Sequence, residues 1–460
     1  MHARNFLDRA RRSKLRRLDG CGDGARRLSA AAEVSVMRSA YSLPRILSRE
    51  ASIATSAKER AEVKYIGFFG LFGVGNFGND GSLEAMLELV RKERPLAKLL
   101  CICRMPTEVG PKFGVRSAQI NSRPKSQLLQ RLDRLLMYIP HEIASVIQTV
   151  RHIRRLDILI VPGTGILDDF STGPQGMPYS MFRWCLLARI MGTKVVLVSI
   201  GAGPIYHPLS RWLMKTAAQM ATYRSYRDRI SKDFMSSIGL DVRNDCVRPD
   251  VAFALPEPAS LREPSAEGEK ITVGIGVMSY NGWRGDKAHN EAVYDAYLRK
   301  LQRFVCWLLT EGYGVRILMG DEVDRRTVER LYRMIETAHN GPVSPAVVAE
   351  PAHSLHDVMA QIAETDLVVA TRYHNVVCAL KLGRPTLSIG YADKNDVLLD
   401  EMGLGDFCQH IEHLDVDLLI QQFRRLAAGR KIYEDRIRKT NSVFAESLRN
   451  QNALLLSRYL

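Results

Sequence analysis

The sequence of 460 residues contains no run of about 18 uninterrupted apolar residues, the length that a membrane-spanning helix needs. We therefore expect no transmembrane helix. The first residues, MHARNFLDRARRSKLRRLDG, also lack the apolar core of a secretory signal. The 8 cysteines are scattered and include no Cys-x-x-Cys pair. These absences predict reduced thiols in a cytoplasmic protein, without a disulfide framework or a zinc site.

Positive charge is concentrated in one part of the chain. Of the formal net charge of +15, residues 1–60 supply +8, from 14 Lys and Arg against 6 Asp and Glu. Such a segment is typical of an arm that contacts nucleic acid or anionic lipid, and it also resembles an organellar transit peptide. The plainer interpretation is a disordered leader, with Met37 as an alternative start. The remaining +7 over residues 61–460 suits an enzyme with anionic substrates.

Beyond the leader, short apolar runs alternate with helical patterns. We expect strands at 64–72, 97–104, 157–163 and 194–201, and helices over 81–95, 124–155 and 179–191. Continuous apolar strands separated by helices are typical of a parallel sheet covered on both faces. The stretch PEPASLREPSAEGE (256–269) interrupts the pattern, and the alternation restarts with KITVGIGVM at 270–278.

The sequence therefore predicts an α/β protein with two Rossmann-like, doubly wound domains that face a cleft. We place a basic leader at 1–60, the first domain at 61–256, a linker at 257–269, the second domain at 270–413 and C-terminal helices at 414–460. In such folds, ligands bind beyond the carboxyl ends of the strands. The residues that follow apolar runs are therefore the candidates for function.

The loop after the first strand contains the pattern Gly73-x-Gly75-x-x-Gly78, the outline of a dinucleotide-binding turn. Such a turn also needs an acidic residue about 20 positions further on, at the end of the second strand, to bind the ribose. That strand ends at Arg104 and continues into Met105, so no acidic residue stands there. This argues against NAD(P) or FAD. A loop that binds another anion or a purely structural turn remain open.

Two further glycine loops follow strands of the first domain, PGTGILDDFSTGP (162–174) and SIGAGPI (199–205). Three such loops in one domain indicate a pocket, because each exposes backbone N–H groups. Asp168 and Asp169 are adjacent and rarely would face one metal ion, so capping or solvation is the simpler explanation. Arg227, in SYRDRIS, carries a guanidinium that binds carboxylate or phosphate through two hydrogen bonds. A surface Arg–Asp network is the alternative.

The richest stretch of the second domain follows the strand DLVVA at 366–370. Arg372 and His374 come directly after it, and Lys394 follows the next strand. A lone histidine is usually structural, but one near an arginine, at a strand end and a helix N-terminus, is typical of acid–base catalysis. We find no set of metal ligands with convincing spacing and expect no metal.

These motifs resemble those of the polysaccharide pyruvyl transferase family. The resemblance spans residues 64–410 and rests on GNFGNDGSLEAML, DILIVPGTGILDD, VSIGAGP, RDRIS, RPDVAF and TRYHNVVCALKLGRPTLSIGY followed by DKN. It implies a fold similar to that of GT-B glycosyltransferases. It also implies transfer of an enolpyruvyl-derived group from phosphoenolpyruvate to sugar hydroxyls, usually leaving a cyclic pyruvate ketal. The family's first loop commonly reads Asn-x-Gly-Asp, whereas here Asn79 takes the last position and Asp80 follows.

The resemblance implies catalytic roles for His374, Arg372 and Arg227. The imidazole would donate and accept protons, and the two guanidinium groups would hold the anionic donor. Substrate-binding positions are expected at Gly75, Asn76, Gly78, Gly163, Thr164, Gly165, Gly201, Gly203 and Lys394.

The expected partners are phosphoenolpyruvate and a sugar or lipid-linked oligosaccharide acceptor, with no cofactor. We expect a cytoplasmic enzyme and leave peripheral contact with the inner face of a membrane open. A GT-B glycosyltransferase with a nucleotide-sugar donor is the alternative function. A nucleic-acid-binding protein is a third hypothesis, but residues 61–460 lack the interleaved aromatic and basic residues that it needs, so we expect no nucleic acid partner. The oligomeric state stays open.

Overall fold

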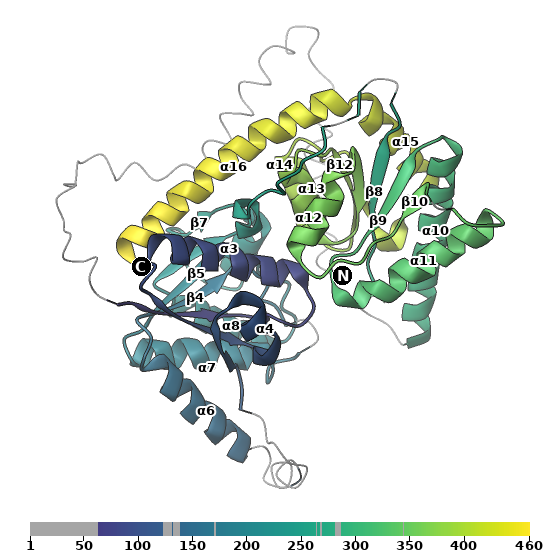
Figure 1. The fold of residues 1–460 in the computed structure, drawn as a ribbon. Coiled ribbons are helices and arrows are strands. Elements are labelled where there is room, and N and C mark those ends of the chain that lie inside the picture. Colours follow the sequence, from purple (N-terminus) through teal and green to yellow (C-terminus); the bar gives the residue numbers. More distant parts are fainter. Residues whose placement is uncertain are drawn as a thin grey trace, which may run out of the picture. The chain divides into compact units, whose positions relative to one another are not determined.

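Two parallel β-sheets with alternating helices make up the computed structural model of this chain (Figure 1). The structure describes residues 63–122, 131, 139–169, 172–263, 265–266, 269–280, 287–343 and 345–460. The predicted leader at 1–60 and part of the helix expected over 124–155 lie outside the described residues. Both sheets belong to one unit of chain contacts, residues 51–460, and the predicted domain boundaries stay a prediction.

The first sheet has seven parallel strands in the order β3-β2-β1-β4-β5-β6-β7. These strands are β1 (Tyr65–Phe69), β2 (Lys98–Cys103), β3 (Arg116–Gln119), β4 (Ile158–Pro162), β5 (Lys194–Ile200), β6 (Tyr223–Tyr226) and β7 (Cys246–Val247). The helices described in this half are α3 (Phe77–Glu93), α4 (Pro106–Phe113), α6 (Ile139–Ile153), α7 (Met177–Ile190), α8 (Pro208–Gln219), α9 (Arg229–Ser237) and the 3-10 helix η3 (Val251–Ala254).

The second sheet has six parallel strands in the order β10-β9-β8-β11-β12-β13. These strands are β8 (Thr272–Gly276), β9 (Gly314–Leu318), β10 (Val347–Val348), β11 (Leu367–Ala370), β12 (Thr386–Gly390) and β13 (Cys408–His410). The helices described here are α10 (Lys287–Thr310), η4 (Glu322–Asp324), α11 (Arg325–Ala338), α12 (Leu355–Ala363), α13 (Tyr373–Lys381), α14 (Asp393–Glu401), η5 (Ile411–His413), α15 (Val416–Ala428) and α16 (Arg430–Arg458).

In each sheet the strand order reverses once, between β1 and β4 in the first and between β8 and β11 in the second. Beside such a reversal, the loops after neighbouring strands diverge to opposite faces of the sheet and leave room for a ligand. The predicted fold class is therefore confirmed. It directs attention to the residues that follow β1, β4, β8 and β11.

The strands are apolar because both faces of each sheet are covered. All five residues of β4 are buried, as the continuous apolar run predicted. One face of the first sheet packs against Ile153 of α6, Trp184 of α7, Met214 of α8 and Met235 of α9. Each large apolar side chain buried in this way contributes about 1.5–3 kcal/mol to folding. Among the described residues, no helix is both long and apolar enough to cross a bilayer.

Helix α3 begins earlier than the sequence predicted, at Phe77 instead of residue 81. The cause is Asn76, whose side-chain oxygen accepts a hydrogen bond from the backbone N–H of Asn79 at 3.1 Å and caps the helix. Consequently Gly78 does not belong to an open loop. It lies in the first turn of α3.

Helix α16, drawn in yellow in Figure 1, contacts elements of both sheets. The Gln451 amide donates to the hydroxyl of Ser199 on β5 at 3.0 Å, and its oxygen accepts from Ser225 on β6 at 2.8 Å. Ten residues earlier, Asn441 donates to the carbonyl oxygens of Leu380 and Lys381 at 2.8 and 3.0 Å, at the end of α13. The helix therefore ties the first sheet to the second.

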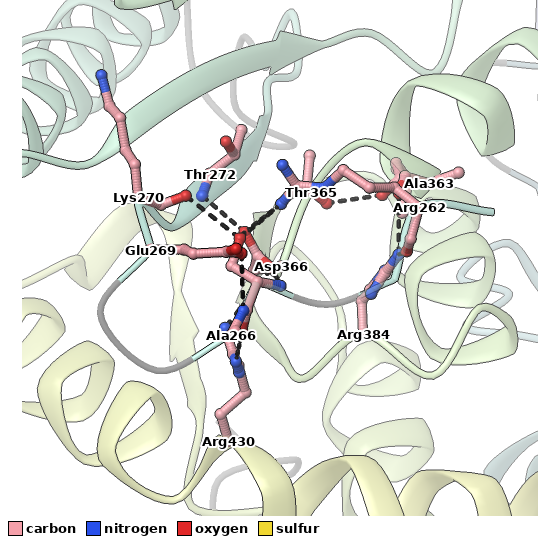
Figure 2. A network of polar contacts seen from close by, with 12 residues as sticks. Arg262, Ala266, Glu269, Lys270, Thr272, Ala363, Thr365, Asp366, Arg384 and Arg430 are labelled. Carbon is pink, nitrogen blue, oxygen red and sulfur yellow. Dashed lines mark hydrogen bonds and ion pairs between the residues drawn. The ribbon is translucent and has the colours of Figure 1, made fainter.

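A buried carboxylate secures the segment that leads into the second sheet (Figure 2). Asp366 precedes β11 and accepts hydrogen bonds from Arg262 at 2.6 Å, from the Ser265 N–H at 2.6 Å and from the Thr272 N–H at 2.8 Å. Arg430, at the start of α16, lies 3.6 Å from the same carboxylate. This network sits at the amino end of β11, whereas Arg372 and His374 follow its carboxyl end. Its role is therefore structural.

Candidate active site

His374 lies in the first turn of α13, directly after β11, and only 13% of its side chain is exposed. Its ring packs on Gly78 of α3. A Cβ atom built on Gly78 would lie 1.8 Å from Nδ1 of His374, which is far too close for two non-bonded atoms. The structure thus brings together two predicted site residues, one on a helix of the first half of the chain and one on a helix of the second half. It also explains why the position in α3 must be glycine.

Asp250 lies between the histidine and an arginine. One of its carboxylate oxygens, Oδ2, is 3.7 Å from Nε2 of His374 and 3.4 Å from Nη1 of Arg227. The other, Oδ1, accepts a hydrogen bond from the N–H of Ala252 and caps η3. The 3.7 Å contact is longer than a hydrogen bond, and it becomes an ion pair only when the imidazole is protonated. Asp250 is fully buried and therefore held in place.

Arg227 and Lys394 converge on the ring of Tyr373. The Arg227 guanidinium lies 4.4 Å from the centre of the Tyr373 ring, and the Lys394 ammonium lies 5.5 Å from it. Lys394 is also 4.5 Å from the Tyr391 ring. Cations favour the negative face of an aromatic ring. The two rings therefore hold two positive charges close together, although like charges repel.

The two cations differ in their carboxylate partners. Arg227 is buried and pairs with Asp250 and, at 3.4 Å, with Asp228. Lys394 forms no ion pair with any carboxylate of the described residues. Its charge is therefore available to an anionic ligand.

Arg372 is oriented differently from the other two cations. Its Nε and Nη2 atoms donate to both carboxylate oxygens of Asp324, at 2.8 and 2.6 Å, and Nη1 lies 3.7 Å from Asp321. Two parallel hydrogen bonds are the strongest geometry available to an arginine. The guanidinium is thus committed to the turn after β9. The sequence motif predicted its importance but could not show these partners.

The first glycine loop contacts that same turn. The carbonyl oxygen of Gly75 accepts from the N–H of Glu322 at 3.0 Å, and the Asn76 amide donates to Asp321 at 3.1 Å. Gly75 has a φ of +92°, a conformation that side chains other than glycine rarely adopt. The structure thus places Gly75 and Asn76 at a contact between the two halves. Their predicted substrate binding stays a prediction.

The other glycine loops surround Arg227 in part. A Cβ on Gly201 would lie 2.8 Å from the Arg227 guanidinium, and one on Gly165 would lie 3.5 Å from Nη2. Gly163 instead packs on Val251, and Gly203 packs on Phe234. Gly165 and Gly201 therefore leave space for the arginine side chain, while Gly163 and Gly203 serve packing.

Three buried polar atoms of this site have no hydrogen-bond partner among the residues that the structure describes. They are Oγ1 of Thr164, Nε of Arg227 and Nε2 of His374, although Nε of Arg227 lies 3.4 Å from Asp228 and Nε2 of His374 lies 3.7 Å from Asp250. Buried polar groups are nearly always hydrogen-bonded, because an unmet group loses its hydration without replacement. The two nitrogens therefore face carboxylates without the geometry of a hydrogen bond, and the Thr164 hydroxyl has no partner in the described part of the chain.

The environment shifts the proton affinity of the two candidate proton carriers. Burial lowers the pKa of His374 below its usual value, and Asp250 only partly offsets this effect. Burial would raise the pKa of Tyr391, but the nearby cations, chiefly Lys394 and then Arg372 and Arg227, outweigh it and lower the pKa. The imidazole is therefore neutral at pH 7, and the phenol is more acidic than an ordinary tyrosine.

Asp80, which follows the position where the family commonly carries an acid, turns away from the histidine. Its carboxylate accepts from the N–H of Gly73 at 2.8 Å and pairs with Lys112 at 2.8 Å. It is only 5% exposed. Asp80 therefore stabilises the glycine loop through its hydrogen bond with the backbone of Gly73.

Two clusters of the described residues carry groups that could hold a metal ion. One comprises His410, Glu412 and His413, and the other comprises Glu84, Glu88 and His356. Neither contains a residue of the candidate site. A reaction without metal or cofactor stays a prediction.

Sequence reasoning did not assign roles to Asp250, Tyr373 and Tyr391. Each stands inside a motif that carried the family resemblance, RPDVAF, TRYHN and the segment before DKN. The signal was thus present, in an acid or aromatic residue directly after a strand. What the sequence lacked was the partner across space, since Asp250 meets His374 only in the folded chain.

Comparisons with known proteins agree on the fold. The UDP-GlcNAc 2-epimerase from Neisseria meningitidis bound to UDP-GlcNAc is 12% identical, with a TM-score of 0.51 over 84% of this chain and 100% of that chain. The S. aureus MnaA–UDP structure is 12% identical, with a TM-score of 0.55 over 85% and 96%. A glycosyltransferase from Rickettsia africae is 10% identical, with a TM-score of 0.53 over 86% and 99%. At such identities the likeness shows the fold alone, and it confirms the predicted GT-B-like class.

Sequence comparison identifies the family. No curated protein matches the chain. The family profile described as polysaccharide pyruvyl transferase, however, matches residues 76–393. This match begins at the N-cap of α3 and ends at the first residue of α14, so it includes Arg227, Asp250, Arg372 and His374 and stops one residue before Lys394. Because it spans 318 of the 460 residues, this chain belongs to the polysaccharide pyruvyl transferase family.

Proposed function

We propose that this enzyme transfers a pyruvyl group from phosphoenolpyruvate to two hydroxyl groups of a sugar and leaves a pyruvate ketal. The observation that carries the proposal is the convergence of the Arg227 guanidinium and the Lys394 ammonium on the ring of Tyr373, with Lys394 unpaired to any carboxylate of the described residues. Phosphoenolpyruvate carries a carboxylate and a phosphate. A buried site rich in cations suits such a donor, and family membership supports the same reaction class.

The donor is held by Arg227 and Lys394 and by the ends of two helices. Helices α13 and α14 both begin at this site, and neither has a side-chain cap. Their first backbone N–H groups are thus available to ligand oxygens, and the positive end of each helix dipole favours an anion. Arg372 contributes indirectly, by fixing the turn at Asp321 and Asp324.

The proton transfers fall to His374 and Tyr391. The neutral imidazole accepts the proton of an attacking sugar hydroxyl, and the acidified phenol donates a proton to the methylene carbon of the donor. In the complete reaction the C=C double bond of the donor becomes a single bond, and its C2–O bond to phosphate and the two sugar O–H bonds break. Two C2–O bonds to the sugar and one C–H bond form. One hydroxyl proton ends on carbon and the other on the departing phosphate. Atoms and charges therefore balance without a cofactor.

The acceptor is a sugar hydroxyl pair of a polysaccharide precursor, free or lipid-linked. A nucleotide-sugar donor is the competing function. Two solved structures of similar fold, which contain UDP or UDP-GlcNAc, are compatible with this alternative. Their sequence identity of 12%, however, shows similarity of the fold alone.

A donor screen tests the proposal. The purified chain is incubated with phosphoenolpyruvate and a panel of free and lipid-linked sugars, and the mass of a pyruvate ketal and the release of phosphate are measured. Lys394→Ala should abolish donor use, whereas Lys439→Ala, at an exposed position of α16, should leave it unchanged. Release of nucleoside diphosphate from a nucleotide sugar, with phosphoenolpyruvate unused, would assign the enzyme to the competing function.

A further inference from the structure

Helix α6 exposes a row of isoleucines to solvent. A helix that packs only on its own sheet would bury such residues. The buried residues of α6 are Ser145, Thr149 and Ile153, spaced by four and therefore on one face. Its exposed large residues are Ile139, Ile143 and Ile147, also spaced by four, and they are 59%, 55% and 46% exposed. Two of the three inward positions are thus hydroxyl residues, while three isoleucines face outward.

The inward hydroxyl groups have structural partners. Ser145 accepts from the N–H of Ser122 at 3.1 Å, and Thr149 donates to the carbonyl oxygen of Ser145 at 2.8 Å. Hydrogen bonds therefore stabilise the inward face of α6. The outward isoleucines keep about half of their surface in contact with solvent, so folding of the described residues buries them only in part.

Further exposed apolar residues lie on α8, which packs with α6 and α7 on the same core cluster of the first sheet. Leu209 is 48% exposed and Trp212 is 51% exposed. The Trp212 ring lies 5.4 Å from that of Phe182 on α7, the helix that contacts both α6 and α8. We call Ile139, Ile143, Ile147, Leu209 and Trp212 the α6–α8 face. Exposed apolar residues on neighbouring helices of one face are typical of interaction surfaces.

The surplus of positive charge on these helices indicates which kind of surface they would bind. Helices α6, α7 and α8 contain five Arg or Lys residues and a single acid, Glu142. Glu142 is paired with Arg183 at 3.3 Å, which leaves the four remaining cations without an acidic counterpart on these helices. Of these, Arg151, Arg189 and Arg211 are exposed. Apolar residues with a surplus of positive charge fit an anionic lipid surface.

We propose that the α6–α8 face docks this enzyme on an anionic membrane. Tryptophan and isoleucine enter the boundary between headgroups and acyl chains, while the arginines contact lipid phosphates. A second copy of the chain would bring the same positive charge against this face and is disfavoured for that reason. The inference does not depend on the identity of the donor, because it concerns a surface outside the candidate active site.

Vesicle flotation with the full-length chain tests the proposal. The vesicles contain either phosphatidylcholine alone or a mixture with phosphatidylglycerol, and no substrate is present. We expect binding to the mixed vesicles, and the double variant Ile143→Glu, Ile147→Glu should weaken it at least about ten-fold, because two inserted apolar chains become charged. Ile432→Glu is the matched control, since Ile432 is 61% exposed on α16. This variant should bind like the unchanged chain.

A second measurement locates the contact. Brominated lipids quench tryptophan fluorescence inside the bilayer, so quenching should be seen with the full-length chain and should fall in Trp212→Phe. Vesicle binding that survives the double variant at full strength would place the lipid contact elsewhere, for example on the basic segment 1–60, and would overturn the proposal. Loss of a dimer in the double variant, without loss of vesicle binding, would assign the face to a second copy instead.

Discussion

At the scale of single residues, Asp250 organises the site. It spans the distance between a cation that can hold the donor and the imidazole that moves the proton. Burial would raise the pKa of Asp250, but His374 and Arg227 outweigh burial and lower it. The carboxylate thus stays charged at neutral pH and orients both partners.

Asp250→Asn should therefore lower turnover by roughly 10²-fold or more, because the proton-transferring imidazole loses its orienting charge. The pH–rate profile separates this role from mere packing. Since Asp250 raises the pKa of His374, its loss should move the acid limb of kcat/KM to lower pH. Asp233→Asn, an exposed position on α9, serves as control and should change neither quantity. An unmoved acid limb in Asp250→Asn would remove the carboxylate from the mechanism.

The pH dependence of the unchanged enzyme should be bell-shaped. Activity rises with pH as His374 loses its proton, with a midpoint below about 6.5 because burial lowers its pKa. It falls again as Tyr391 loses its proton, with a midpoint below about 10 because the neighbouring cations, led by Lys394, overcome the effect of burial and lower its pKa. Tyr391→Phe should remove the alkaline limb, and His374→Ala should lower turnover about 10²–10⁴-fold. An alkaline limb that persists in Tyr391→Phe would show that another group donates the proton.

At this scale the sequence predicted part of the site. Arg227, His374 and Lys394 could be found because each follows an apolar strand within a recognisable motif. The commitment of Arg372 to Asp324 could not, since those residues come from different strand ends and meet only in the folded sheet. Local patterns report which residues stand at a strand end. They do not report the charges that those residues meet across space.

At the scale of elements, the start of α3 supports the histidine. The sequence predicted an anion-binding loop here, but capping by Asn76 extends the helix through Gly78 and brings its backbone against His374. The sequence prediction overlooked helix capping, which needs only one side-chain oxygen, here that of Asn76, near the first backbone N–H groups.

Gly78→Ala separates the two interpretations. Alanine favours a helix more than glycine does, so a simple helix position would gain about 1 kcal/mol of stability. Here the new methyl group would meet the His374 ring, displace it and lower turnover by about 10²-fold, as small misplacements of catalytic groups do. The measurement is steady-state kinetics alongside circular dichroism. Gly341→Ala is the control, because no heavy atom lies within 4 Å of its added Cβ. Full activity in Gly78→Ala would contradict the close packing.

At the scale of the whole molecule, the two sheets followed from periodicity, because parallel strands buried on both faces read as continuous apolar runs. The course of α16 did not. The C-terminal segment was predicted to be helical. Its periodicity does not show that the side chain of Gln451 forms hydrogen bonds with strands β5 and β6, because those partners are distant in the sequence.

Gln451→Ala tests the tie between the sheets. The change removes the hydrogen-bond partner of the Ser199 hydroxyl and one partner of the Ser225 hydroxyl, so the free energy of unfolding should fall by about 1–3 kcal/mol. Urea unfolding followed by circular dichroism measures this. Asn450→Ala, its exposed neighbour on the same helix, should change stability by no more than about 0.5 kcal/mol. Equal midpoints for the two variants would mean that α16 does not stabilise the first sheet through this amide.

The path of α16 has a consequence for the order of folding during synthesis. Every strand of both sheets leaves the ribosome before Arg430, where α16 begins. Three hydroxyl groups of the first sheet, those of Ser199, Tyr223 and Ser225, nevertheless form hydrogen bonds with Gln451 of α16. The amino-terminal half therefore lacks these bonds while the other half is translated. A nascent chain stalled before residue 430 should remain sensitive to protease in its first sheet, and release of the next thirty residues should protect it.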